Sequence, residues 1–121
     1  MKSIPELDAT IQARTPISAI GVGHTFIRAY QFAQKCNNDE LDFYDTFFET
    51  DVPGMAADCK RFQIKSFTIS SPHSNMADSL WALQQLGWRI TGMTQINSQF
   101  KNYKTGAYDR ISALRLAYHP A

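Results

Sequence analysis

The chain has 121 residues, of which 44% are hydrophobic and 19% are charged, and its formal net charge is +1 at pH 7. This length and composition predict a single domain over residues 1–121, which buries about two thirds of its unfolded surface without disulfides or bound metal. So small a charge does not indicate a nucleic-acid or membrane partner, and the sequence has neither a signal peptide nor an apolar run near the ~18 residues of a membrane span, so we expect a cytoplasmic protein.

Two amphipathic helices are predicted first, because apolar residues recur at helical spacing over residues 3–14 and again over residues 15–36. Ser3 is placed to cap the first helix. Gly21 and Gly23 each cost about 1 kcal/mol relative to Ala inside a helix. We therefore expect them to weaken the second helix or to split it.

Residues 37–51 contain six acids and no Lys or Arg. Asn37 with Glu40 three residues later resembles a capping box, which predicts a helix here. Its inward-facing residues would be Leu41, Tyr44, Phe47 and Phe48. Its outer face would carry the acids Asp42, Asp45 and Glu49. A further helix is predicted from Asp51 to Phe62, after a kink near Val52.

The pattern changes at residue 64. Residues 64–70, IKSFTIS, are β-branched and aromatic enough to predict the first strand. A helix follows, with its start signal at Asn75 and Asp78 and its end at Gly87.

Two more strands follow, because hydropathy alternates over residues 88–97 and again over residues 110–118. The segment between them, residues 98–109, contains the turn-prone pair Thr105-Gly106 and predicts a hairpin connection. The whole order predicts an α+β domain: N-terminal helices followed by β-α-β-β, with a small three-stranded sheet and helices packed on one face. The β-α-β unit would connect Phe67 to Ile90 through a crossover helix.

A strand, a polar turn and a helix start make the layout that proteins use to bind phosphate. The residues that could donate hydrogen bonds to an anion here are Ser70, Ser71, His73, Ser74 and Asn75. However, residues 68–78 include no Gly to let the backbone approach an anion and no Lys to neutralise it. The sequence therefore favours a capped helix start over an anion site.

The hairpin segment interleaves aromatic residues with cations. These residues are Phe100, Lys101, Tyr103, Lys104, Tyr108 and Arg110. Aromatic rings that stack on bases, beside cations that meet phosphates, are the components of single-strand binding. The alternative is an exposed hairpin whose aromatic rings fold back on the sheet.

The acids Asp42, Asp45 and Glu49 have three interpretations. They could ligate a divalent ion, but the sequence offers no fourth ligand, so no metal site is predicted. They could be a solvated helix face. They could also form a partner-binding surface that meets a basic protein.

No catalytic residue and no cofactor are predicted. Cys36 and Cys59 lack metal-ligand or CxxC spacing and are expected to be reduced, buried thiols. The GVGH run at residues 21–24 lacks the third glycine and the preceding strand of a dinucleotide-binding loop.

Several runs carry a resemblance: ELDFYDTFFETDVPGMAADCKRF, FTISS, LGWRITGMTQIN and ISALRLAY. Together they resemble a family of small uncharacterised proteins from mobile elements of Firmicutes, a domain of unknown function, over most of residues 15–118. The resemblance implies an accessory protein of a mobile element that acts on a host component.

The leading hypothesis is a non-enzymatic cytoplasmic protein that binds a protein partner, for example an inhibitor of a host defence nuclease of the anti-CRISPR kind. Its contact surface would be the acidic helix face or the aromatic-basic hairpin. The first alternative is a nucleic-acid-binding module that uses the hairpin. The second is a small enzyme with a site at the end of the first strand. The sequence does not indicate an oligomeric state.

Overall fold

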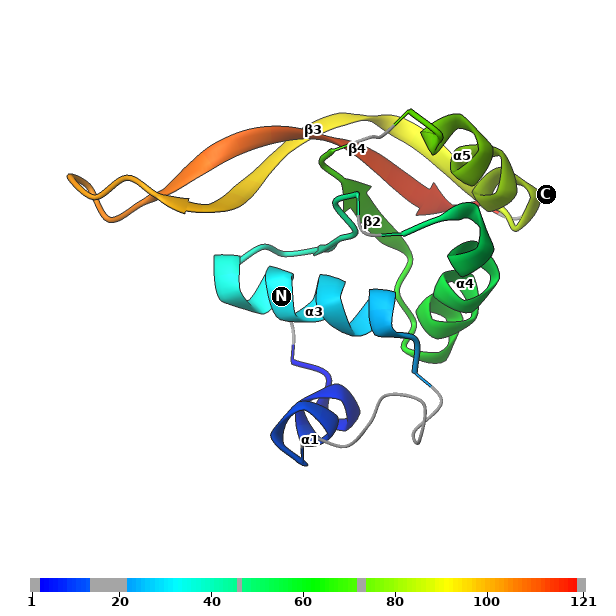
Figure 1. Ribbon diagram of the computed structural model, residues 1–121, viewed down its shortest axis with the longest axis horizontal. Coiled ribbons are helices and arrows are strands. Elements are labelled where there is room, and N and C mark those ends of the chain that lie inside the picture. Colours follow the sequence, from blue (N-terminus) through cyan, green and yellow to red (C-terminus); the bar gives the residue numbers. More distant parts are fainter. Residues whose placement is uncertain (1–2, 14–21, 46, 72–73, 120–121) are drawn as a thin grey trace.

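The computed structural model describes residues 3–13, 22–45, 47–71 and 74–119, which adopt an α+β fold (Figure 1). In chain order the elements are α1 (Pro5–Ala13), α3 (His24–Cys36), β1 (Leu41–Asp42), η1 (Glu49–Asp51), α4 (Val52–Arg61), β2 (Ser66–Ile69), α5 (Met76–Gln85), β3 (Trp88–Lys101) and β4 (Tyr108–Tyr118). Within these residues the sheet has four strands in the order β1-β2-β4-β3. The predicted fold class is confirmed, and the predicted number of strands is wrong by one.

The additional strand is β1, in the segment where the sequence predicted a helix. Residues 37–45 form no helix, because Asn37 adopts a left-handed backbone conformation (φ 59°) and ends α3 instead of starting a new helix. Asn is one of the few residues that tolerate this conformation at a helix C-terminus. The chain then leaves α3 in an extended conformation, and Leu41–Asp42 pair in parallel with Phe67 and Thr68 of β2.

Four apolar residues of this segment were predicted to face inward, and the prediction is correct for two of them. Leu41 and Phe47 are fully buried, whereas Tyr44 is 44% exposed and Phe48 is 70% exposed. Without the helix, the spacing that should have put all four on one face does not apply. The short 3-10 helix η1 then leads into α4 at Val52, where a kink was predicted.

The β2-α5-β3 unit is a split crossover. β4 pairs antiparallel with both β2 and β3, so β2 and β3 are parallel to each other with β4 between them. The direct parallel neighbour of β2 is therefore β1.

The remaining helices agree with the sequence pattern. α1, α4 and α5 lie within the predicted ranges. The predicted start of the second helix at Thr15 lies outside the described residues. Within them, Val22 and Gly23 are not helical and α3 begins at His24, so the prediction of one unbroken helix over residues 15–36 is wrong. The Gly23 N–H donates to the Asp58 carboxylate at 3.0 Å and so connects the start of α3 to α4.

The core lies between the sheet and the helices, and α3 and α4 lie on the same side of the sheet (Figure 1). Aromatic rings cross it from α3 to β3. Ring centroids are 6.4 Å apart for Phe26 and Phe43, 4.9 Å for Phe43 and Phe67, and 4.6 Å for Phe67 and Trp88. Each such contact adds about 0.5–1.5 kcal/mol beyond the burial of apolar area. This row of rings fixes β1, β2 and β3 relative to α3.

Cys36 and Cys59 are buried and free, as expected. Among the described helices, none combines the length and the apolar character needed to cross a bilayer.

Candidate functional site

The outer half of the β3–β4 hairpin extends beyond the other two strands (Figure 1). β2 pairs only with residues 114–117 of β4, while β3 and β4 remain paired as far as Lys101 and Tyr108. The connecting turn is ordered by Asn102, whose carbonyl accepts the Gly106 N–H at 2.7 Å and whose side chain accepts the Lys104 N–H at 2.9 Å. The hairpin is therefore a preformed ribbon that carries its side chains into solvent.

Two aromatic side chains of this ribbon do not fold back on the sheet. Tyr103 is 90% exposed and Phe100 is 64% exposed. An aromatic side chain can bury about 150–250 Å², so these two rings leave a large area available for contact with a partner. The alternative in which the aromatics cover the sheet is wrong for these two residues.

Tyr108 has a different role from the other two aromatics. Its hydroxyl donates to the main-chain carbonyl of Lys35 at the end of α3, and the Lys101 ammonium lies 4.8 Å from the centre of its ring. Tyr108 thus anchors the hairpin to α3 and holds Lys101 in place.

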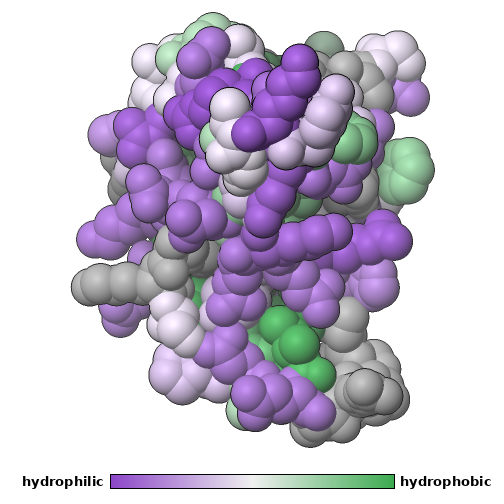
Figure 2. Space-filling view, turned by 90° about the vertical axis from the view of Figure 1, so that its left-hand side faces the viewer, coloured by the Kyte–Doolittle hydropathy of each residue, from purple (hydrophilic) through white to green (hydrophobic). Residues whose placement is uncertain are grey.

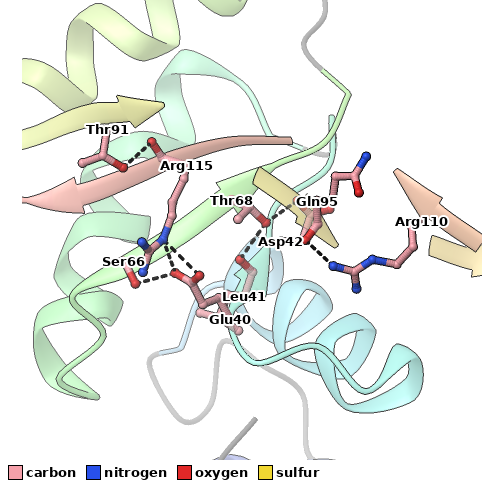
Figure 3. A network of polar contacts seen from close by, with 9 residues as sticks. All are labelled: Glu40, Leu41, Asp42, Ser66, Thr68, Thr91, Gln95, Arg110 and Arg115. Carbon is pink, nitrogen blue, oxygen red and sulfur yellow. Dashed lines mark hydrogen bonds and ion pairs between the residues drawn. The ribbon is translucent and has the colours of Figure 1, made fainter. Parts of the chain in front are cut away.

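The Arg110 side chain also makes hydrogen bonds within the protein. It donates to the Asn97 side-chain oxygen at 2.7 Å and to the Gln95 carbonyl at 2.8 Å, the second of which Figure 3 shows. Asn97 is in turn bonded to Asn38, which ends the turn after α3. Sequence reasoning missed both asparagines, since nothing in their local pattern distinguishes them from other loop residues.

Exposed cations continue from the hairpin onto α3. Lys35 and Arg28 are seven residues apart, which places them on one face of the helix. Neither they nor Lys101 and Lys104 make an ion pair within the described residues. The seven-residue spacing is a signal that the sequence contained and that the initial interpretation did not use.

A cavity of about 490 Å³ joins the hairpin to α3 and to the carboxyl ends of β1 and β2. Phe100 of β3, Arg28 of α3, and Ser70 and Ser71 after β2 all line it. Ligands of sheets with parallel strands typically bind at these strand ends. The structure therefore brings two of the predicted strand-end residues, Ser70 and Ser71, next to Phe100 of the predicted hairpin.

Asp42 lines the same cavity but is only 2% exposed. Its two oxygens accept hydrogen bonds from the Thr68 hydroxyl, which Figure 3 shows, and from the Ser70 hydroxyl, each at 2.7 Å. The main-chain N–H groups of Tyr44 and Ser70 donate to it as well. Burial raises the pKa of this carboxyl, and the four donors partly oppose that shift. Four donors match the about four lone-pair sites of a carboxylate, so Asp42 joins β1 to β2 and has no acceptor position left for a ligand.

The predicted acidic helix face is therefore wrong. Asp42 is a buried strand residue, Asp45 lies in the loop after β1, and Glu49 begins η1, so the three acids do not share a face. In the described part of the chain, no group of three or more potential metal-ligating side chains comes together.

The predicted anion-binding residues are divided by the structure. The Ser70 hydroxyl donates to a carboxylate of the protein itself, at the strand end where a phosphate would sit. Ser71 lines the cavity, Ser74 and Asn75 are exposed before α5, and His73 lies outside the described residues.

Arg115 of β4 forms an ion pair with Glu40, which precedes β1. Its Nε lies 3.1 Å from a Glu40 oxygen, and Ser66 also donates to Glu40 (Figure 3). Among the described residues, the cations near the hairpin without an ion pair are therefore Arg28, Lys35, Lys101, Lys104 and Arg110, and Arg110 is held by neutral acceptors.

Comparison with known proteins gives one family model, described as a domain of unknown function (DUF7698), which matches residues 25–118. Neither the curated proteins nor the solved structures contain a match.

Proposed function

The chain belongs to the family described as domain of unknown function DUF7698, and from that premise, which assigns no activity, we propose that it binds single-stranded nucleic acid with the outer half of the β3–β4 hairpin. The observation that carries the proposal is the exposure of Phe100 and Tyr103 beside Lys101 and Lys104. Every base has a face that stacks on an aromatic ring, and such stacking contributes about 1–3 kcal/mol per base.

The cations of α3 extend the proposed path. Arg28 and Phe100 line one cavity, and the Lys35 carbonyl contacts Tyr108, so α3 lies directly beside the hairpin. A strand that stacks on the hairpin would meet three or four cations along this route. Its affinity should then fall with salt with a slope of about −2 to −3 in log K against log salt concentration, at about −0.7 per phosphate contact.

The character of the surrounding surface favours a polar partner. The side of the molecule that carries the hairpin tip is mostly hydrophilic, with a strongly hydrophobic area low in the view and weaker ones at the top and right edges (Figure 2). A stable interface with a protein usually has an apolar centre, which this side lacks in that view.

The test is fluorescence anisotropy with a labelled oligonucleotide of about 12 nucleotides, in single-stranded and duplex form, over a range of salt concentrations. We expect the single strand to bind more tightly. Tyr103→Ala should weaken binding roughly fivefold to a hundredfold, and Lys101→Ala with Lys104→Ala should reduce the salt slope by about 1.4.

The matched control removes two lysines at the opposite end of the sheet, Lys60→Ala with Lys65→Ala. It takes away the same charge and should leave the salt slope unchanged. Equal loss in both double variants would mean that only net charge matters, and equal affinity for duplex and single strand would contradict stacking; either result refutes the proposal.

A second candidate is a cytoplasmic protein-binding role in a Firmicutes mobile element, such as inhibition of a host defence nuclease. It is favoured by three exposed apolar side chains on α5 and the first half of β3. They are Trp81 (62% exposed), Ile90 (51%) and Met93 (65%).

A pull-down from host lysate, with and without nuclease treatment, separates the two candidates. A nuclease-resistant partner that is lost on Trp81→Ser with Met93→Ser, and kept on Lys101→Ala with Lys104→Ala, would support the protein-binding role.

The enzymatic alternative has the weakest support. Among the described residues that line the 490 Å³ cavity, Asp42 is the one carboxylate, and its hydrogen-bonding positions are already filled. It is therefore badly placed to act as a general base.

A further inference from the structure

A second cavity, of about 670 Å³, lies at the end of the sheet opposite the hairpin tip. Its walls come from α4, from the turn at residues 63–65, and from the start of β3 and the end of β4. The apolar residues that line it include Ala56, Ala57, Ile64, Leu86, Trp88 and Tyr118. The volume is within the ~300–1,000 Å³ range of small-molecule sites.

The cavity is a consequence of side-chain size. α4 presents the small residues Ala56 and Ala57 toward the sheet end, where the large rings of Trp88 and Tyr118 stand 5.5 Å apart between centroids. Small residues on one wall leave space that the opposite wall does not fill. Leu86, also in the lining, remains 42% exposed. Tyr118 is 44% exposed as well, so the apolar lining is open to solvent at these two residues, while Trp88 lies deeper.

Two lysines complete the lining. Lys60 is at the end of α4, and Lys65 follows the turn in which the Ile64 N–H donates to the Cys59 carbonyl at 2.8 Å. The Lys65 carbonyl accepts the Tyr118 N–H at 2.9 Å, which holds this lysine against the cavity. Within the described residues neither lysine makes an ion pair, and no acid lines the cavity.

We propose that this cavity binds a free single-chain anionic amphiphile, such as a medium-chain fatty acid. The alkyl chain would cover the apolar lining, and the carboxylate would meet Lys60 and Lys65. The ligand would be smaller than a protein segment and would need no second macromolecule. The site is independent of nucleic-acid binding, because Trp88 pairs with Tyr118 at the far end of the ribbon from Tyr103.

The test uses the tryptophans of the chain as reporters. The chain has two, the exposed Trp81 and the cavity-lining Trp88, which is 3% exposed. In the full-length Trp81→Phe variant, Trp88 is the one remaining fluorophore. The probe is 11-bromoundecanoate at neutral pH, because bromine quenches tryptophan at short range.

We expect quenching of Trp88 that saturates below the concentration at which the probe forms micelles. Lys60→Gln with Lys65→Gln should weaken binding about tenfold. Two partly exposed ion pairs are lost, and each contributes up to about half a unit of pKd. Lys101→Gln with Lys104→Gln is the matched control and should bind as tightly as the parent. Ala56→Leu should narrow the cavity and weaken saturable quenching, while circular dichroism confirms that the variant is folded.

Three results would overturn the proposal. The first is quenching that rises linearly without saturation. The second is binding that does not depend on the anionic head group. It would appear as equal affinity for 11-bromoundecanol and for the acid, or as equal affinity of the acid for the parent and for the Lys60→Gln, Lys65→Gln variant. The third is quenching by vesicles of brominated phosphatidylglycerol without quenching by the free acid, which would assign the cavity to a membrane surface.

Discussion

Asn38 and Asn97 bond to each other in both directions and so fasten α3 to β3. The Asn97 N–H donates to the Asn38 side-chain oxygen at 2.8 Å, and the Asn38 side-chain nitrogen donates to the Asn97 carbonyl at 3.0 Å. Asn38 is 5% exposed, so water cannot easily replace it. This pair sets where the hairpin leaves the sheet and therefore where Phe100 and Tyr103 are presented.

Asn38→Ala should lower the free energy of unfolding by about 1–3 kcal/mol, because it leaves the main-chain groups of Asn97 without partners in a region closed to water. Urea denaturation measures the change. Gln31→Ala on the exposed face of α3 is the control and should shift stability by less than about 0.5 kcal/mol. Equal effects of the two substitutions would show that the asparagine pair has no special role.

Phe43→Ala should destabilise the protein by about 3–5 kcal/mol, because Phe43 is fully buried and contacts the rings of both Phe26 and Phe67. Phe48→Ala, in the same segment but 70% exposed, should cost less than about 1 kcal/mol. Denaturant unfolding curves for the two variants provide a direct comparison. A loss for Phe48→Ala as large as that for Phe43→Ala, or larger, would contradict the strand conformation of residues 41–42, because the helix predicted from the sequence has Phe48 and not Phe43 among its inward-facing residues.

The buried carboxyl of Asp42 predicts a pH dependence. Its pKa is raised in the folded state by burial, above the ordinary value of 3.8, so the folded protein binds this proton more readily than the unfolded chain does. The stability that this residue contributes is therefore greatest below about pH 3.8 and is lost as the pH rises through the raised pKa.

The measurement is the difference in unfolding free energy between wild type and Asp42→Asn, followed from about pH 3 to pH 7. The unfolding free energy of wild type relative to that of the variant should be greatest near pH 3 and should decrease as the pH rises. Asp45→Asn, at an exposed position, controls for loss of a surface charge. A relative stability of wild type that increases with pH would reverse the sign and refute the assignment.

Neither cysteine should react with iodoacetamide in the folded protein at neutral pH. Burial raises the pKa of Cys59 to about 12 and also raises the pKa of Cys36, so the thiolate that reacts is scarce at both positions. Mass spectrometry should find no adduct on the native chain and two adducts after unfolding in urea. Rapid modification of the native protein would place a thiol at the surface.

The sequence by itself determined the elements whose signals lie within a few neighbouring residues. Apolar spacing and caps located α1, α4 and α5, and alternating hydropathy with Thr105-Gly106 located the hairpin. In these segments the local pattern and the tertiary structure demand the same conformation. The interleaved aromatics and cations of the hairpin were likewise visible before any fold was known.

Only the tertiary structure decided that residues 41–42 form a strand and that Asp42 is buried. A two-residue strand is too short to show a period, and Asn37 can start a helix or end one with equal local justification. Asp42 is buried because Thr68 and Ser70, 26 and 28 residues away, supply its donors. The sequence pattern could not show these partners, since strand pairing brings together residues that no local window contains.

The same physical reason separates the hairpin residues that are presented from those that are anchored. Tyr103 and Tyr108 have the same side chain and lie in one predicted loop. Tyr108 is held because its hydroxyl reaches the Lys35 carbonyl, 73 residues away in the chain, whereas Tyr103 extends into solvent. Composition determined that an aromatic and basic surface exists, and the packing of β4 against the end of α3 decided which of its side chains can meet a partner.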